Sequence, residues 1–492
     1  MLLVKKGDDK MCEKRIKCRI ISNASVGCLL LLIPLLSIIL DPISMAIKYG
    51  TAVRNGTFLF EIFQTEVSGT RLSLYVFNIT NSERFIAGVD PKLNIEEVGP
   101  FTYVETRRNG DIEMNEENED LWFTPLMTVR FLPEESIGNP KDIRVTVPNL
   151  AFMSATSLLR SYPSLLRHGF NLLARQMRSR IITNLDANSF LWGYHDPMIG
   201  LANRVAPGLI YFDRLGIIDR LYDNNTLYRI QMSVKHEEKF SVKRLMRYLR
   251  AKPINQQKKP LESYNFTNTY EGASFPPGLT RQTPLNVYRI GVCRVLNLEF
   301  HEEVPMDYGP TAWSYKISNE TFNRDCGFGI CGMLDLSNCT FGIPIAISRT
   351  HFLNTDPKLY EKIEGMRPDP KKHDSTFVLE PKMGLELETR LSLQLNMVLG
   401  DISFNSEGRY FSNMTVPIAY IQVVQPEVFD NFKALLKLAY VYVPAILLSV
   451  EIILFLAGAA LLARAGKLYW DTRRRREQYI LSLNEKQIPL MS

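Results

Sequence analysis

Cationic side chains gather in one stretch of the chain that holds no acidic residue, between Asp142 and Asp186. Guanidinium groups bind carboxylates and phosphates through charge-assisted hydrogen bonds. The stretch is therefore a candidate surface for an anionic ligand, and the alternative is a solvated helix face. The candidate ligand-binding residues are Arg160, Arg167, His168, Arg175, Arg178 and Arg180.

The sequence carries no recognisable catalytic motif. It has no G-x-S-x-G nucleophile elbow, no P-loop and no G-x-G-x-x-G after a strand. The segments HEEKF (236–240) and HEEVP (301–305) lack the second histidine of a zinc protease. We therefore assign no catalytic residue, no metal ligand and no cofactor, and expect that the protein is not an enzyme.

Four cysteines lie in the central part of the chain, at Cys293, Cys326, Cys331 and Cys339. In an oxidising compartment they predict two disulfides, with three pairings open. A zinc site is the alternative, but there is no C-x-x-C pair and no histidine close by. The two glycines in CGFGIC (326–331) favour a local loop closed by its own bridge.

Two apolar segments predict membrane spans. Residues 20–40 carry no charge. As a helix with a rise of ~1.5 Å per residue, this segment is long enough to cross a hydrocarbon core of ~30 Å. A cleaved signal peptide is the alternative for this segment. The second span covers 438–463, and its one charge is Glu451, either a contact with another helix or a tolerated acid.

The charge distribution predicts a hairpin topology. The net charge is +6, but residues 41–437, between the spans, hold no basic excess, since the excess lies in the two tails, 1–19 and 464–492. Lys and Arg residues flank each span at the end nearer the chain terminus, and this places both tails in the cytoplasm. Residues 41–437 then form an extracellular or lumenal domain, and nucleic-acid binding is not expected.

Sequons and the remaining cysteines fit this topology. Seven N-x-Thr sequons lie between the spans and predict glycosylation at Asn55, Asn78, Asn224, Asn265, Asn319, Asn338 and Asn413. Three thiols lie in or beside the first span, as palmitoylation candidates or ordinary reduced cysteines: Cys12, Cys18 and Cys28.

The central part mixes strand and helix patterns. Strand-like stretches rich in Val, Ile, Thr, Tyr and Phe occur at 69–80, 99–108, 142–149 and 414–424. Residues 149–185 read as helical, with Asn149 as the N-cap of the first helix and Pro163 at a break.

Several segments together resemble the class B scavenger receptor family, which includes fatty-acid translocase, the high-density-lipoprotein receptor, lysosomal integral membrane protein and insect sensory neuron membrane proteins. They are VGPFTYVE (98–105), FLWGYHDP (190–197), FPPGL (275–279), the cysteines of 293–339, the segment 367–396 and VPIAYIQ (416–422). The resemblance extends over nearly the whole chain.

The resemblance implies an α+β membrane protein. Its large ectodomain would have an antiparallel β-barrel core, a lipid tunnel and an apical helical bundle at 149–185, and two terminal transmembrane helices would hold it. It also implies the pairings Cys293–Cys339 and Cys326–Cys331, and ligand contacts by the basic residues before LWGY. The expected partners are the membrane, lipoprotein particles and lipids, whether fatty acid, sterol, carotenoid or phospholipid, and a homo-oligomer stays open.

Three functions fit the resemblance. The first is a lipid-uptake receptor of the plasma membrane that transfers lipid to the bilayer. The second is a lysosomal or endosomal receptor for protein cargo, which the tail supports less because Lys486 stands where a dileucine signal has an acid before Leu490. The third is an insect-type sensory co-receptor for pheromones.

Overall fold

A computed structural model describes residues 2–205, 212–219, 222, 226–250, 254, 257, 259–323, 326, 331–340 and 342–485. The chain forms two compact units. The helical unit contains 1–49, Asp307–Pro310 and Asp430–Ser492, and the larger unit contains Gly50–Met306 and Thr311–Phe429. Each unit is described by itself below.

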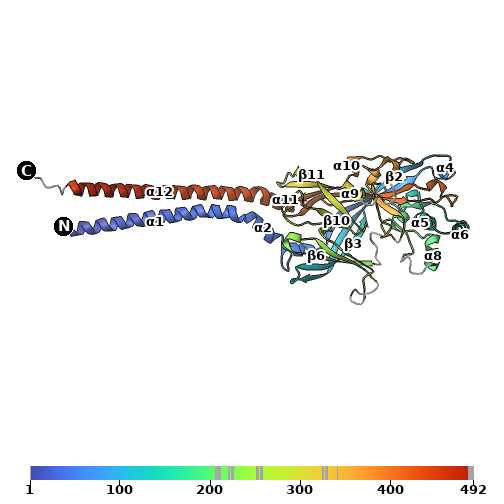
Figure 1. Ribbon diagram of the computed structural model, residues 1–492, viewed down its shortest axis with the longest axis horizontal. Helices are drawn as coiled ribbons and strands as arrows, with labels where there is room; N and C mark the ends of the chain where they lie inside the picture. Colours follow the sequence, from blue (N-terminus) through green and yellow to red (C-terminus); the bar gives the residue numbers. More distant parts are fainter. Residues whose placement is uncertain are drawn as a thin grey trace, which may run out of the picture. The chain divides into compact units, whose positions relative to one another are not determined.

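The helical unit is built on two long helices that lie side by side (Figure 1). They are α1 (Leu2–Leu40) and α12 (Val443–Glu485), with the shorter α2 (Pro42–Gly50), α11 (Asp430–Lys437) and the π-helical turn η7 (Leu438–Tyr442) beside them. Both long helices include segments apolar and long enough to cross a membrane. Most of their Leu and Ile side chains are exposed, as lipid-facing side chains are.

Two glycines allow close contact between α1 and α12. A Cβ on Gly27 would lie 2.9 Å from Leu462 Cγ and 3.0 Å from the Gly458 carbonyl oxygen. A Cβ on Gly458 would lie 2.9 Å from the Gly27 carbonyl oxygen. Small residues let helix backbones approach in a bilayer, where packing rather than the hydrophobic effect drives association.

The larger unit is built on one sheet of 16 strands, almost all antiparallel. Its main path runs β8-β7-β6-β3-β2-β1-β18-β17-β16-β12-β11-β10-β9. Tyr270 of the last strand is bridged to Ser241, which directly precedes β7, so the path returns on itself. This closure gives the antiparallel barrel that the resemblance implied.

The strands of the larger unit follow in chain order. They are β1 (Val67–Ile79), β2 (Leu93–Asn115), β3 (Asp120–Phe131), β4 (Arg144–Pro148), β5 (Ile182–Asp186), β6 (Thr226–Ser233), β7 (Val242–Leu249), β8 (Glu262–Asn265), β9 (Thr269–Tyr270), β10 (Leu285–Arg289), β11 (Arg294–Pro305), β12 (Thr311–Ile317), β13 (Met333–Asp335), β14 (Ile345–Ser348), β15 (Ile363–Glu364), β16 (Thr376–Glu380), β17 (Leu385–Val398) and β18 (Thr415–Val424).

Short helices of the larger unit gather mostly at one of its ends, around α5, α6 and α8 (Figure 1). The helices are α3 (Phe58–Gln64), α4 (Ser82–Ile86), α5 (Leu150–Leu159), α6 (Ser164–Gln176), α7 (Ala187–Trp192), α8 (Pro197–Val205), α9 (Asn319–Asn323) and α10 (Pro370–His373). The Asn149 side chain accepts a hydrogen bond from Phe152 N and caps α5, and Pro163 separates α5 from α6, both as predicted.

The predicted helical region 149–185 is too long. Helix α6 ends at Gln176, and Ile182–Asp186 forms strand β5, which pairs with β4 in a separate two-stranded sheet. The β-branched run Ile181-Ile182-Thr183 favours a strand. Pairing with the Val-rich β4 therefore determines the extended conformation of Ile182–Asp186. The leucines upstream had favoured a helix that continues through this segment.

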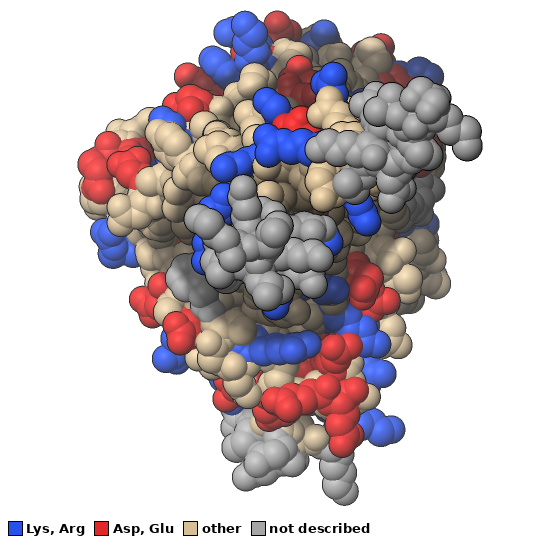
Figure 2. Space-filling view, turned by 90° about the vertical axis from the view of Figure 1, so that its left-hand side faces the viewer, with Lys and Arg blue, Asp and Glu red and all other residues tan. Residues whose placement is uncertain are grey.

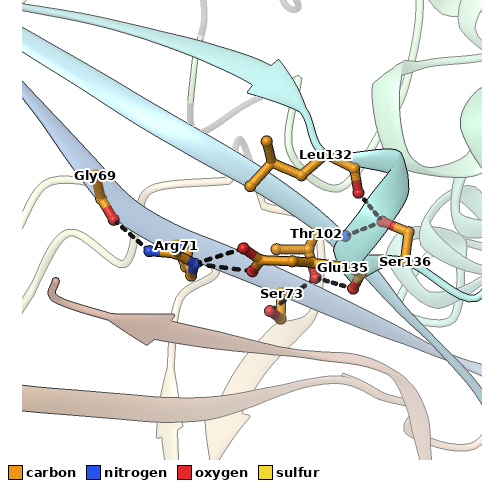
Figure 3. A network of polar contacts seen from close by, with 7 residues as sticks. All are labelled: Gly69, Arg71, Ser73, Thr102, Leu132, Glu135 and Ser136. Atoms are coloured by element: carbon orange, nitrogen blue, oxygen red, sulfur yellow. Dashed lines mark hydrogen bonds and ion pairs between the residues drawn. The ribbon is translucent and has the colours of Figure 1, made fainter.

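A polar network fixes the chain after β3 onto β1 and β2 (Figure 3). Arg71 Nε donates to both carboxylate oxygens of Glu135, at 2.9 and 2.8 Å. The Thr102 hydroxyl donates to the Glu135 carbonyl, and Thr102 N donates to the Ser136 hydroxyl. Both ionic side chains are partly exposed, so the network contributes mainly to the position of the turn.

The pairing of α1 with α12 gives a first prediction. Gly27→Leu should force the two helices apart, because the larger side chain meets the Gly458 backbone. The matched control is Gly466→Leu, since nothing lies within 4 Å of a Cβ at Gly466. Fluorescence energy transfer between dyes near the two ends of the full chain should fall in the first variant only. Equal transfer in both variants would contradict this contact.

Candidate functional site

The sheet of the larger unit encloses a cavity of about 1040 Å³. Small-molecule sites usually measure ~300–1,000 Å³, so this space can hold a ligand of considerable size. All of its wall residues belong to the larger unit, and most of them are apolar. This cavity is the strongest candidate for a ligand site.

Alternation along β17 creates the apolar wall. Leu391, Leu393 and Leu395 point to one face because successive side chains of a strand alternate, and all three line the cavity. In the neighbouring strand β18, Val423 is paired with Leu391 and Ile421 with Leu393. These cross-strand pairs extend the apolar face around the cavity.

The residues between those leucines are polar and buried against another layer. The Ser392 hydroxyl lies 2.8 Å from the Thr350 hydroxyl, and Gln394 Oε1 accepts from His351 N at 2.7 Å. The stretch LSLQLN thus alternates between the cavity and a polar layer formed by residues around 350 and 375. Paired polar groups let β17 bury both faces without unsatisfied hydrogen bonds.

Several charged groups in the cavity wall are paired with one another. Arg107 holds both carboxylate oxygens of Glu271, at 2.7 and 2.9 Å. Burial lowers the pKa of Arg107, but the charge and hydrogen bonds of Glu271 and the charge of Glu105 together outweigh it, so the net pKa is raised. The other pairs are Arg247 with Glu262 at 2.6 Å and the Tyr222 hydroxyl with Glu105 at 2.5 Å.

A second polar cluster joins Glu97, His351 and His373, whose potential ligand atoms lie within 4.8 Å of one another. The two imidazole rings stack with centroids 4.3 Å apart. His351 Nε2 lies 2.9 Å from Glu97 Oε2. The histidines come from different segments, and sequence reasoning missed the cluster because 22 positions separate them.

The tautomers of this cluster follow from backbone donors. Arg367 N donates to His351 Nδ1 at 3.1 Å, and Asp369 N donates to His373 Nδ1 at 3.0 Å. Because an N–H group can only donate, each Nδ1 is an acceptor and each ring proton lies on Nε2. A metal at Nε2 would have to displace those protons, so the pattern favours a hydrogen-bonded neutral pair over a metal site.

Burial and the neighbouring ring set the acid–base behaviour of this cluster. Burial, together with the charge of His351, lowers the pKa of His373 to about 4. Burial raises the pKa of Glu97, but the hydrogen bonds from His351 and Tyr420 and the charges of the two histidines together outweigh this, so the net pKa lies below its usual value. The folded protein therefore keeps His373 neutral and Glu97 ionised at neutral pH.

The predicted basic cluster is only partly available to a ligand. Arg180 pairs with Glu407 at 2.7 Å and with Glu83 at 3.6 Å. The Arg167 guanidinium lies over the Phe404 ring, 5.5 Å from its centroid. Arg160 packs against Gly400, where an added Cβ would lie 1.7 Å from Nη1. Acids, an aromatic ring and a glycine from distant segments thus contact three of the six residues.

His168, Arg175 and Arg178 remain exposed. Within the described part of the chain, none of these three forms an ion pair. Helix α6 carries His168 and Arg175, and Arg178 lies two residues beyond its end. The same helix has three exposed leucines: Leu165, Leu166 and Leu172 are 82%, 51% and 70% exposed. The helix therefore offers cations and apolar side chains together.

Elsewhere, on the face shown in Figure 2, Lys and Arg side chains are interspersed with Asp and Glu.

The cysteines form the two pairs that the resemblance implied, Cys293–Cys339 and Cys326–Cys331. Cys293 and Cys339 line the cavity. On α1, Cys18 and Cys28 are exposed free thiols, and Cys12 lies on the same helix.

The sequons differ in exposure. The exposed asparagines are Asn55, Asn265, Asn319, Asn338 and Asn413. Asn78 is partly buried, and its side-chain oxygen accepts from Thr146 N at 2.8 Å. Asn224 lies outside the described residues. Glycosylation at these sites stays a prediction.

The histidine cluster predicts acid sensitivity. The unfolded chain takes up a proton at His373 below about pH 6.5, whereas the folded protein does so only near pH 4. The unfolded state binds more protons in this window, so stability falls as pH falls from about 6.5 to 4, by up to about 3 kcal/mol for His373.

Melting temperatures of the full-length protein between pH 4 and 7.5 test this prediction. His373→Asn should flatten the decline, whereas the control His301→Asn should keep it because His301 is exposed. An unchanged pH slope in His373→Asn would contradict the account of the cluster.

Comparison with known proteins agrees with this architecture. A family model described as the CD36 family matches residues 24–469. Scavenger receptor class B member 1 of Bos taurus is 26% identical over 404 residues, which cover 80% of this chain and 77% of the relative. Lysosome membrane protein 2 of Mus musculus is 23% identical over 413 residues, or 80% and 83% of the two chains. With this match, a closed sheet and two long apolar terminal helices, the chain belongs to the CD36 family of class B scavenger receptors.

Proposed function

We propose that this protein is a membrane receptor that binds amphiphilic lipids in the cavity of its larger unit and passes them to the membrane without covalent chemistry. The observation that carries the proposal is the cavity of about 1040 Å³ with its leucine-rich wall. Burying each CH₂ group of a lipid there contributes ~0.8 kcal/mol, which is a sufficient driving force for capture.

The topology that we propose places both ends of the chain in the cytoplasm and residues 41–437 outside. Basic residues next to both apolar segments, on the side of the chain termini, support this topology. Two disulfides in the larger unit and the exposed thiols on α1 fit an oxidising and a reducing side. We propose the plasma membrane as the location, with glycans on the sequons and acyl chains on Cys12, Cys18 and Cys28.

The exposed part of α6 supports a role in ligand capture. Its cations attract anionic particles over roughly a Debye length, ~8 Å at physiological salt. The neighbouring leucines then contact the apolar surface of a lipid or lipoprotein particle. We assign this role to Arg175 and Arg178 in particular, with His168 beside them.

A lysosomal or endosomal receptor for protein cargo is the second candidate. The observation that favours it is the match to lysosome membrane protein 2 of Homo sapiens, 23% identical over 77% of this chain and 79% of the relative. Imaging of the tagged full-length protein in cells separates the two candidates, since the first predicts a surface signal and the second an intracellular one.

A bulky substitution in the cavity tests lipid binding. Ile421→Trp should reduce the affinity for a fluorescent single-chain lipid by roughly tenfold or more, because the indole fills space that the ligand needs. The control is Val89→Trp, at a side chain that is 61% exposed and outside the cavity wall. Equal binding by both variants would show that the lipid does not enter the cavity.

Charge reversal tests the capture surface. The double variant Arg175→Glu/Arg178→Glu should bind anionic phospholipid vesicles several-fold more weakly at low salt, and the difference should shrink as salt rises. Arg108→Glu is the control, because Arg108 is exposed on β2 outside the cluster. Unchanged vesicle binding by the double variant would remove α6 from the mechanism.

A further inference from the structure

One arginine of the cavity wall is not paired like its neighbours. Arg107 and Arg247 each have a carboxylate partner. Arg289 also lines the cavity, yet within the described part of the chain its side chain has no ion pair and no hydrogen bond, and its Nε is buried without an acceptor. A cation in a largely apolar space is costly unless an anion meets it.

The local structure holds Arg289 in this place. It is the last residue of β10, and its guanidinium packs against Gly272, where an added Cβ would lie 3.1 Å from Nη2. Gly272 has a φ of +98°, which a side chain would strain. The absence of a side chain at this position leaves room for the guanidinium beside the cavity.

The carboxylate that interacts electrostatically with Arg289 already accepts hydrogen bonds from other residues. Glu386 is attracted by Arg289, but its Oε2 accepts from Gln425 Nε2 at 2.8 Å and its Oε1 accepts from the Thr389 hydroxyl. Burial raises the pKa of Glu386 to about 7, so its carboxyl group is only partly ionised at neutral pH. Glu386 therefore compensates the charge of Arg289 only in part.

We propose that Arg289 binds the carboxylate head group of a single-chain amphiphile whose hydrocarbon chain lies along the leucines of β17. This inference rests on the proposed function, since it assumes that the cavity holds a lipid. The planar guanidinium matches the two oxygens of a carboxylate. A dianionic phosphate monoester fits less well because one guanidinium balances only one of its two charges.

Three ligands with one shared hydrocarbon chain test the head-group preference: oleate, oleyl alcohol and oleoyl lysophosphatidate. Their affinities are measured on the full-length protein in phospholipid nanodiscs, with empty nanodiscs as the correction for partitioning. The wild type should bind oleate roughly tenfold more tightly than the alcohol, as expected for a charge-assisted hydrogen bond, and more tightly than the phosphate.

Variants at Arg289 assign the preference to this residue. Arg289→Gln should lose the preference for oleate while its affinity for the alcohol stays within about twofold, and Arg289→Lys should retain part of it. Arg281→Gln is the matched control, since Arg281 is an exposed cation of the same unit, paired with Glu303 and outside the cavity wall. It should bind all three ligands as the wild type does.

Two results would overturn the assignment: equal affinity of the wild type for oleate and the alcohol, or an Arg289→Gln variant that still prefers oleate. If the wild type bound oleoyl lysophosphatidate more tightly than oleate, the proposed preference for a carboxylate over a phosphate would be wrong. These results leave lipid binding in the cavity intact. Failure of the wild type to bind either oleate or the alcohol would instead refute the proposed function itself.

Discussion

The closure of one sheet around an apolar space is the constraint on which the rest of the larger unit depends. A strand that lines this space and also supports an outer layer must bury both of its faces. β17 does so by alternation, with Leu391, Leu393 and Leu395 toward the cavity and Ser392 and Gln394 paired with the layer outside. The hydrogen bonds of that outer layer keep the leucines in register, because a shift by one residue would turn polar groups into the cavity.

The apolar space inside the sheet also constrains where charged side chains lie in the larger unit. Buried ions need partners, and Arg107 has its partner in Glu271 from a distant segment. Backbone N–H groups occupy Nδ1 of both His351 and His373, and burial lowers the pKa of His373 so that it stays neutral at neutral pH. Against this background Arg289 is an exception, and a charged group in a cavity without a paired partner is a candidate ligand contact.

The sequence predicted those features that depend on neighbours along the chain. The two apolar segments, the cap at Asn149 and the break at Pro163 follow from local composition and backbone chemistry. The structure has a long helix through each apolar segment, and helices that begin after Asn149 and after Pro163. The strand at Ile182–Asp186 was missed because its stability comes from pairing with β4, 38 residues upstream at Thr146 and Asn184. The basic cluster looked free of acids because Glu83 and Glu407, which pair with Arg180, lie far away in the sequence. The cavity wall could not be predicted, since it combines residues from many strands.

Lipid extraction and mass spectrometry of the intact protein, purified from a membrane without added lipid, test the central claim most directly. The account predicts an amphiphile retained close to one per protein and lost from the Ile421→Trp variant, because the cavity of about 1040 Å³ is apolar and enclosed by the sheet. Recovery of equal lipid from both proteins, or of none beyond that of the surrounding bilayer, would contradict a ligand site inside the larger unit.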